Sequence, residues 1–355
     1  MSNTPSTPAV ADVAAWSQGP TVAVVGAYGH TGRFVVAELL RRGATPLLVG
    51  RDRGKLDALR GLAPDAPVRV ASTEDAASLD RALDGAVAVV NCAGPFLATS
   101  LPVVDAALRA GIPYLDVAAE QGVTAALFDT YGDRARDAGV VVAPSLAFYG
   151  GLGDLLATAA LGEWPDADEI TLAYGLDSWH PTQGTRLTGE SNAGQHLVHS
   201  GGGLRPFDYS QDVFSWDFPK PFGTQDASAF ATADQVTLPR HVRTPEVRAV
   251  MNLAPLRDVR AARTPEPVPA DADGRSAQTF VVEAVVRRGE ETRRAVAGGR
   301  DIYAVTAPLV VEALERVLDG RCATPGVRAA GEAFDAADFL RALTPGHLTR
   351  LDLPV

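Results

Sequence analysis

The feature that most constrains the fold is an alternation of short apolar runs and helical patterns that begins at residue 21. The apolar runs are mostly continuous, which is typical of strands covered on both faces. Amphipathic helical stretches separate them, and right-handed crossovers between such strands predict a doubly wound parallel α/β sheet of six strands. The predicted strands are residues 21–27, 46–50, 68–71, 87–93, 114–118 and 140–144.

A glycine-rich turn, Gly26-Ala27-Tyr28-Gly29-His30-Thr31-Gly32, lies between the first predicted strand and the first predicted helix. Gly26 permits a tight bend, Gly29 lets a pyrophosphate approach the backbone, and Gly32 allows the helix to pack closely on the strand. The N–H groups at the helix start are free to bind the anion. This context predicts a Rossmann domain that binds a dinucleotide. The cofactor-binding residues expected in the turn are Gly26, Tyr28, Gly29, His30, Thr31 and Gly32.

The end of the second predicted strand distinguishes NAD from NADP. NAD enzymes place Asp or Glu there to bind the ribose hydroxyls. Here the chain reads Gly50-Arg51-Asp52-Arg53-Gly54-Lys55, and the planar guanidinium of Arg51 suits a 2′-phosphate. The sequence therefore favours NADP(H). Asp52 keeps NAD open as the alternative, and solvated charges at a helix start are the purely structural interpretation.

Small and polar residues end the fourth and fifth predicted strands, in the crevice where such sheets bind ligands. Cys92 is better explained as a small buried residue than as a nucleophile, because no basic residue is near it in sequence. Glu120 fits a position facing a ligand, a helix cap or a surface salt bridge equally well. The cofactor-binding residues expected here are Asn91, Ala93, Gly94, Pro95 and Asp116.

Beyond residue 150 the pattern changes. Residues 180–242 show little periodicity, which is typical of a long functional loop or an extended lid, apart from a possible helix at 186–199. Residues 279–287 and 292–297 predict a hairpin. The other expected elements are helices at 153–161, 305–318 and 335–343 and a strand at 169–176.

Hydride transfer requires an oriented nicotinamide and a proton donor where charge develops. Tyr149 is the best-placed donor because it follows the sixth strand, although packing at a domain hinge explains it equally well. His196 and His199 would share a helix face but have no clear third ligand, so no metal site is predicted. His180 is a further donor candidate, and Arg186 could clamp a carboxylate or phosphate. The catalytic candidates are Tyr149, His196 and Arg186.

Composition narrows the class of protein. The 355 residues suffice for two domains, and a net charge of −11 argues against nucleic-acid and membrane partners. Two cysteines exclude a disulfide framework, and no apolar run is long enough for a membrane span. Residues 1–19 read as a disordered tail without a signal peptide, so a cytoplasmic protein is expected. Aromatic residues between 207 and 222 either cover an apolar substrate or pack at a dimer interface, and the sequence does not choose between these roles. We expect a homodimer.

These motifs together resemble the saccharopine dehydrogenase-like NADP-binding family, and within it the trans-acting enoyl reductases. The resemblance is specific over residues 21–161 and fainter at 237–241 and 299–303. It implies a Rossmann domain, an α+β substrate domain with a mixed sheet, and C-terminal helices packed on the Rossmann domain. The expected division is a tail at 1–19, the Rossmann domain at 20–150, a substrate and dimerisation domain at 151–300, and the C-terminal helices at 301–355.

Two departures keep the family's substrate from being carried over. Ala147-Phe148-Tyr149-Gly150-Gly151 replaces a Gly-Phe-Asp-Ser-like turn, and Thr182-Gln183-Gly184-Thr185 replaces a Ser-Gly-Gly-Thr-like segment. The expected function is an NADPH-dependent reductase that transfers hydride to a C=C or C=N bond of a specialised-metabolite or lipid intermediate. One alternative is a saccharopine-type amino-acid dehydrogenase. Its substrate would carry several carboxylates, and Arg186 and Arg205 are few cations to bind them. The other alternative is a non-catalytic NADP(H) sensor.

Overall fold

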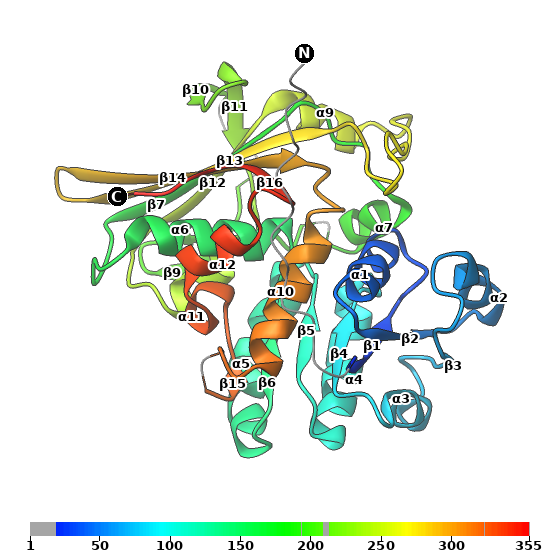
Figure 1. The fold of residues 1–355 in the computed structure, drawn as a ribbon. Helices are drawn as coiled ribbons and strands as arrows, with labels where there is room; N and C mark the ends of the chain where they lie inside the picture. The colour runs from blue at the N-terminus through cyan, green and yellow to red at the C-terminus, as the bar shows by residue number, and fades with distance from the viewer. Residues whose placement is uncertain (1–18, 193, 209–212, 323, 355) are drawn as a thin grey trace, which may run out of the picture.

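The computed structural model describes residues 19–192, 194–208, 213–322 and 324–354, so the expected tail lies outside the described residues up to residue 18. The first sheet is parallel throughout, with the strand order β15-β6-β5-β4-β1-β2-β3 (Figure 1). This strand order is that of a Rossmann sheet, the fold predicted from the sequence. Its strands are β1 Thr21–Val25, β2 Thr45–Gly50, β3 Val68–Val70, β4 Ala88–Asn91, β5 Tyr114–Asp116, β6 Val141–Ala143 and β15 Gly326–Val327.

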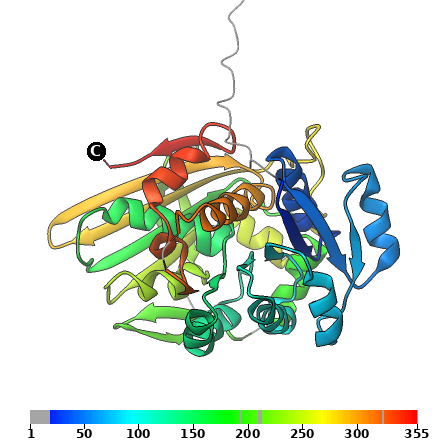
Figure 2. The same ribbon diagram turned by 60° about the horizontal axis from the view of Figure 1, so that its bottom comes forward.

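Apolar side chains alternate between the two faces of the first sheet, which is why both faces are covered by helices. In β1, Val22 and Val24 pack with α1 and α10, whereas Ala23 and Val25 pack with α3 and α4. Figure 2 shows α10, in orange, between the two halves of the molecule. The helices of this domain are α1 His30–Arg41, α2 Arg53–Asp57, η1 Ala58–Gly61, α3 Ala76–Leu83, α4 Phe96–Ala110, α5 Gln121–Asp137 and α10 Thr306–Leu318.

The second sheet is mixed and, within the described residues, has nine strands. Its main path is β10-β11-β12-β7-β13-β14-β16, and β8 pairs with β12 and β9. The expected fold class, a Rossmann domain with an α+β domain that holds a mixed sheet, is confirmed. The strands are β7 Glu169–Leu176, β8 Leu197–Ser200, β9 Gly203–Pro206, β10 Phe214–Phe218, β11 Gly223–Ala229, β12 Val247–Asn252, β13 Thr279–Arg288, β14 Glu291–Arg300 and β16 Leu348–Asp352.

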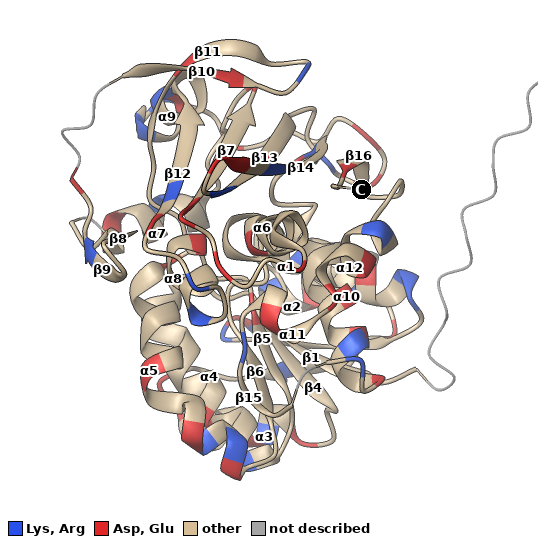
Figure 3. Ribbon diagram, turned by 90° about the vertical axis from the view of Figure 1, so that its left-hand side faces the viewer, with Lys and Arg blue, Asp and Glu red and all other residues tan. Residues whose placement is uncertain are grey.

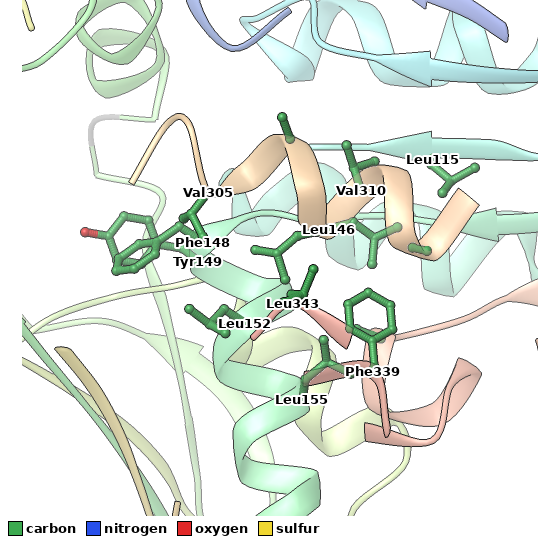
Figure 4. Packing of buried hydrophobic residues seen from close by; sticks show 14 of the residues in the cluster. Leu115, Leu146, Phe148, Tyr149, Leu152, Leu155, Val305, Val310, Phe339 and Leu343 are labelled. Carbon is green, nitrogen blue, oxygen red and sulfur yellow. The ribbon is translucent and has the colours of Figure 1, made fainter. Parts of the chain in front are cut away.

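Helices of the second half join it to the first. The α6 helix lies against β13 and β14, and α11 and α12 pack on α6. Figure 4 shows part of the apolar cluster at this junction, to which Phe148, Leu152, Val310 and Phe339 belong. The remaining helices are η2 Phe148–Leu152, α6 Gly153–Leu161, α7 Gln183–Ser191, α8 Asp234–Thr237, η3 Leu238–Arg240, α9 Leu253–Arg260, α11 Ala330–Ala333 and α12 Ala336–Ala342.

The segment from 180 to 242 differs from the expectation of a long loop. It contains α7, β8 to β11 and α8, and these strands extend the second sheet. The helix predicted at 186–199 is wrong in its second half, since α7 ends at Ser191 and Gly194 turns with a φ of +77°. Residues 197–200 then pair with β12 and β9, so tertiary pairing overrides the helical pattern.

The C-terminal segment contributes to both sheets. The β15 strand pairs with β6 as a seventh strand of the Rossmann sheet, beyond the six that were predicted, and β16 pairs with β14 in the second sheet.

On the side shown in Figure 3, acidic and basic residues are intermixed along the helices, α5 among them. None of the helices in the described ranges is long and apolar enough to cross a bilayer.

Candidate dinucleotide site

The three glycines of the turn between β1 and α1 have different surroundings. Gly26 has a φ of +79°, and a Cβ there would lie 2.8 Å from the Ala93 backbone. A Cβ at Gly32 would lie 2.3 Å from the Gly26 carbonyl oxygen. At Gly29 the nearest atom would be the Gly26 oxygen at 3.1 Å, a tight contact but a milder one than those at Gly26 and Gly32. Gly26 and Gly32 therefore serve packing, whereas the Gly29 backbone is left open to a ligand.

The start of α1 is suited to an anion. Gly29 is its N-cap, no side chain caps the helix, and the first turn has no acidic residue. The first N–H groups of a helix have no partner within it, so those of His30, Thr31 and Gly32 can bind a phosphate. These residues are brought together as predicted, beside a half-buried Tyr28.

The charged residues after β2 divide into paired and unpaired groups. The carboxylate of Asp52 caps α2 by accepting a hydrogen bond from the Lys55 backbone N–H at 3.1 Å. The Arg53 guanidinium is 2.8 Å from Asp57. The exposed Arg51 side chain has no hydrogen bond or ion pair with any described residue. Arg51 is therefore free to bind a 2′-phosphate.

The predicted residues at the end of β4 are partly internal. The fully buried Asn91 side chain accepts a hydrogen bond from the Ala93 N–H at 3.0 Å. Ala93, Gly94 and Pro95 are partly or fully exposed and present their backbone at the edge of the sheet. Burial raises the pKa of the Cys92 thiol, which supports its interpretation as a packing residue rather than a nucleophile.

Asp116, another predicted cofactor ligand, is fully buried. One carboxylate oxygen accepts from the Ala118 and Ser145 N–H groups at 3.0 and 2.7 Å, and the other accepts from the Tyr114 hydroxyl at 2.8 Å. Burial raises the pKa of this carboxyl to about 6. Asp116 thus holds the ends of β5 and β6 together, and its full burial leaves no exposed surface for a cofactor to contact.

Glu120 joins the Rossmann domain to α7. Its carboxylate is 1% exposed and accepts from the Phe96 N–H at the start of α4 and from the Thr188 hydroxyl, both at 3.0 Å. The surface salt bridge that the sequence left open is therefore wrong. The helix cap is formed, on the first residue of α4. No local pattern around Thr188 indicated this contact.

Tyr303 is the residue that sequence reasoning missed at the other end of α7. Its ring meets the His30 ring edge to face, with centroids 5.2 Å apart. Its hydroxyl is 2.9 Å from the Thr185 hydroxyl and accepts from Trp179 Nε1 at 3.0 Å. Tyr303 thus links α7 to the glycine-rich turn between β1 and α1, residues 26–32, which we call the phosphate turn. The 299–303 segment, part of the family resemblance, was the available signal.

Tyr149 is 8% exposed and belongs to the apolar cluster that Figure 4 shows in part. Its hydroxyl has no hydrogen-bond partner among the described residues. Burial raises the pKa of this phenol well above its ordinary value. The ring fits a packing role, but the unpartnered hydroxyl has no role in packing. The neighbouring rings, at centroid distances of 4.9 to 5.7 Å, are Phe148, Tyr174, Trp179 and Phe230.

The structure disperses the other catalytic candidates. Arg186 donates to the Thr264 carbonyl at 2.6 Å. The buried His199 lies in β8, with Nε2 3.0 Å from the Thr244 oxygen. His196 precedes β8, so the predicted helix face shared by the two histidines does not exist, and burial lowers the pKa of His196. His180 lines a cavity of about 240 Å³ beside Tyr303.

Metal ligands are not grouped in the part of the chain that the structure describes. It holds no set of three or more His, Cys, Asp or Glu side chains placed to bind a metal ion.

Comparison with known families supports the cofactor domain. Residues 22–142 match the family model of the saccharopine dehydrogenase NADP-binding domain. A probable mitochondrial saccharopine dehydrogenase-like oxidoreductase of Arabidopsis thaliana is 32% identical over 140 residues, 35% of this chain and 31% of that protein. The trans-acting enoyl reductase of Mycobacterium ulcerans is 29% identical over 133 residues, 36% of this chain and 32% of that protein. The matched segment thus spans about a third of these relatives.

The structural comparison covers more of the chain. Apo saccharopine dehydrogenase (L-Glu forming) from Saccharomyces cerevisiae superposes with a TM-score of 0.64 over 95% of this chain and 100% of that one, at 13% identity. At this identity the likeness shows the fold alone. The family resemblance is therefore confirmed for the NAD(P)-binding segment. The relatives do not single out the enoyl reductases, since saccharopine dehydrogenase-like oxidoreductases match at similar identity.

Proposed function

We propose that this protein is an NADP(H)-dependent oxidoreductase that acts as a reductase. The observation that carries the proposal is the unpaired Arg51 at the end of β2, on the same sheet edge as the open Gly29 turn. The neighbouring Asp52 caps α2 and Arg53 is paired, which leaves Arg51 as the group for the 2′-phosphate. The family match at residues 22–142 supports the same cofactor.

The reduced nicotinamide, when bound, supplies a hydride to the substrate. The α1 N-terminus would bind the pyrophosphate, and the backbone of residues 93–95 would border the nicotinamide side. Tyr149 is the proposed proton donor. Burial raises its pKa, which keeps the phenol protonated but weakens it as an acid, so release of the proton would require a positive charge nearby, such as the oxidised nicotinamide. The proposed substrate bond is C=C or C=N. The relative named a trans-acting enoyl reductase supports C=C.

A direct test is titration of the protein with NADPH and NADH, followed by nicotinamide fluorescence. We expect NADPH to bind more tightly. Arg51→Ala should weaken NADPH by roughly 1–3 kcal/mol, the loss of one charge-assisted contact, and leave NADH unchanged. Arg53→Ala is the matched control, because it removes an exposed arginine that already has a partner. Equal affinities of the wild type for both cofactors would refute NADP(H) selectivity.

A second measurement concerns the reaction. NADPH oxidation in the presence of enoyl and imine substrates would establish a reductase. Binding of NADPH without turnover of any substrate would favour the sensor alternative.

A further inference from the structure

Gly50 occupies the position at which NAD enzymes place an acid. It is the last residue of β2, where an Asp or Glu would bind the ribose hydroxyls. Its φ is not in the left-handed region, so the backbone does not require glycine there. Another reason for the missing side chain must therefore lie in its surroundings.

The Tyr28 ring fills the space of that side chain. A Cβ on Gly50 would lie 2.6 Å from Tyr28 Cε1, 3.3 Å from Cδ1 and 3.4 Å from Cζ. The half-buried ring packs on the apolar core, and the Lys55 ammonium lies 5.7 Å from its centroid. The ring could make room only by leaving these contacts.

We propose that the Tyr28 ring takes the place of a ribose-binding acid on residue 50, so that this site can gain such an acid, and with it NADH affinity, only when the ring is removed. Its ring belongs to the phosphate turn and closes the site of the ribose-binding carboxylate, which leaves Arg51 as the side chain that reads the 2′ position. This inference rests on the proposed cofactor function. Arg51 attracts the 2′-phosphate, and the Tyr28 ring fills the volume that a ribose-binding carboxylate on residue 50 would need.

The first experiment converts the selectivity. Tyr28→Ala combined with Gly50→Asp should raise NADH affinity about tenfold or more over Tyr28→Ala alone, through carboxylate hydrogen bonds to the ribose. NADPH affinity should fall, because the acid repels the 2′-phosphate. Tyr28→Phe combined with Gly50→Asp is the matched control, since the ring remains, and it should gain no NADH affinity. Circular dichroism checks the fold of each variant.

The second experiment tests the steric contact without a cofactor. Gly50→Ala should lower the melting temperature when Tyr28 is present and have little effect in the Tyr28→Ala background. This comparison remains decisive if the aspartate variants fail to fold.

Three results separate the possibilities. A folded Tyr28→Ala/Gly50→Asp protein without NADH gain would overturn the inference. So would Gly50→Asp alone gaining as much as the double variant, or Gly50→Ala having equal effects in both backgrounds. A wild type that binds neither dinucleotide would instead refute the proposed cofactor function.

Discussion

The carboxyl edge of the first sheet and the interface between α1 and α10 use the same residue types in opposite ways. At the interface, the Arg42 side chain is 2% exposed and lies 2.7 Å from both Glu38 and Glu312, and it also pairs with Glu315. At the edge, Arg51 is exposed and has no partner among the described residues. A charge that the fold already neutralises contributes to stability, whereas a charge left unpaired beside an anion site is available to a ligand.

Buried polar groups without a hydrogen-bond partner are the uncharged counterpart of the unpaired Arg51. The Tyr149 hydroxyl is buried without a partner among the described residues, and so is His30 Nε2 in the phosphate turn. Burying a polar group without a hydrogen bond destabilises the fold by about 1–3 kcal/mol, so such groups are candidates for function. The comparison therefore predicts that substitutions at the edge impair binding or catalysis, whereas those at the interface impair folding.

The largest expected effect is on catalysis. Tyr149→Phe should lower kcat by roughly 10²–10⁴-fold if the phenol protonates the substrate. Stability should stay equal or rise, because the variant removes an unpartnered hydroxyl and keeps the ring contacts. Thermal melting and kcat measured where chemistry limits turnover test both parts. A near wild-type kcat would show that Tyr149 serves packing alone, and that an unpartnered hydroxyl does not by itself indicate a catalytic role.

At the interface, Arg42→Met should lower the free energy of unfolding by about 3–5 kcal/mol, because it leaves Glu38, Glu312 and Glu315 without their shared cation. NADPH affinity should stay at the wild-type value at temperatures where the variant is folded. Urea denaturation and cofactor titration are the measurements. A loss of affinity in the folded protein would show that the two regions are coupled.

Gly29→Val sharpens the comparison within a single turn. A side chain there should block the approach of the pyrophosphate and weaken NADPH by about 100-fold or more, while the fold survives. Gly32→Val should instead fail to fold normally, because its Cβ would lie 2.3 Å from the Gly26 oxygen. Cofactor titration with circular dichroism distinguishes the two. Retained affinity in folded Gly29→Val would make that glycine structural as well.

The smallest expected effect is the pH dependence of Asp116, which is at the edge but fully paired. Its pKa of about 6 in the folded protein lies above the ordinary 3.8, so the folded state keeps a proton that the unfolded chain releases. The stability contribution of Asp116 should therefore fall as pH rises from about 4 to about 6, by roughly 1–3 kcal/mol. Asp116→Asn should remove this slope in denaturation curves. An unchanged slope would assign it to other buried carboxyls such as Asp234, whose pKa is also raised to about 6.

The periodicity of the sequence determined the Rossmann half, because parallel strands and amphipathic helices are local patterns. It also predicted the glycine-rich turn between β1 and α1, where Gly26 and Gly32 lie against neighbouring backbone, and the hairpin of β13 and β14. The partners of Asp52 and Arg53 lie close in sequence, within α2, although neither pairing was predicted.

Tertiary structure alone decided which polar groups are satisfied. Arg42 has a local partner in Glu38, but its pairing with Glu312, 270 positions away, could not be predicted from the sequence. Glu120 likewise meets Thr188, and His30 meets Tyr303. The helix predicted across residues 186–199 ends early because residues 197–200 pair with strands of the second sheet. These outcomes depend on the packing of distant segments, which brings desolvation and partners that no local pattern encodes.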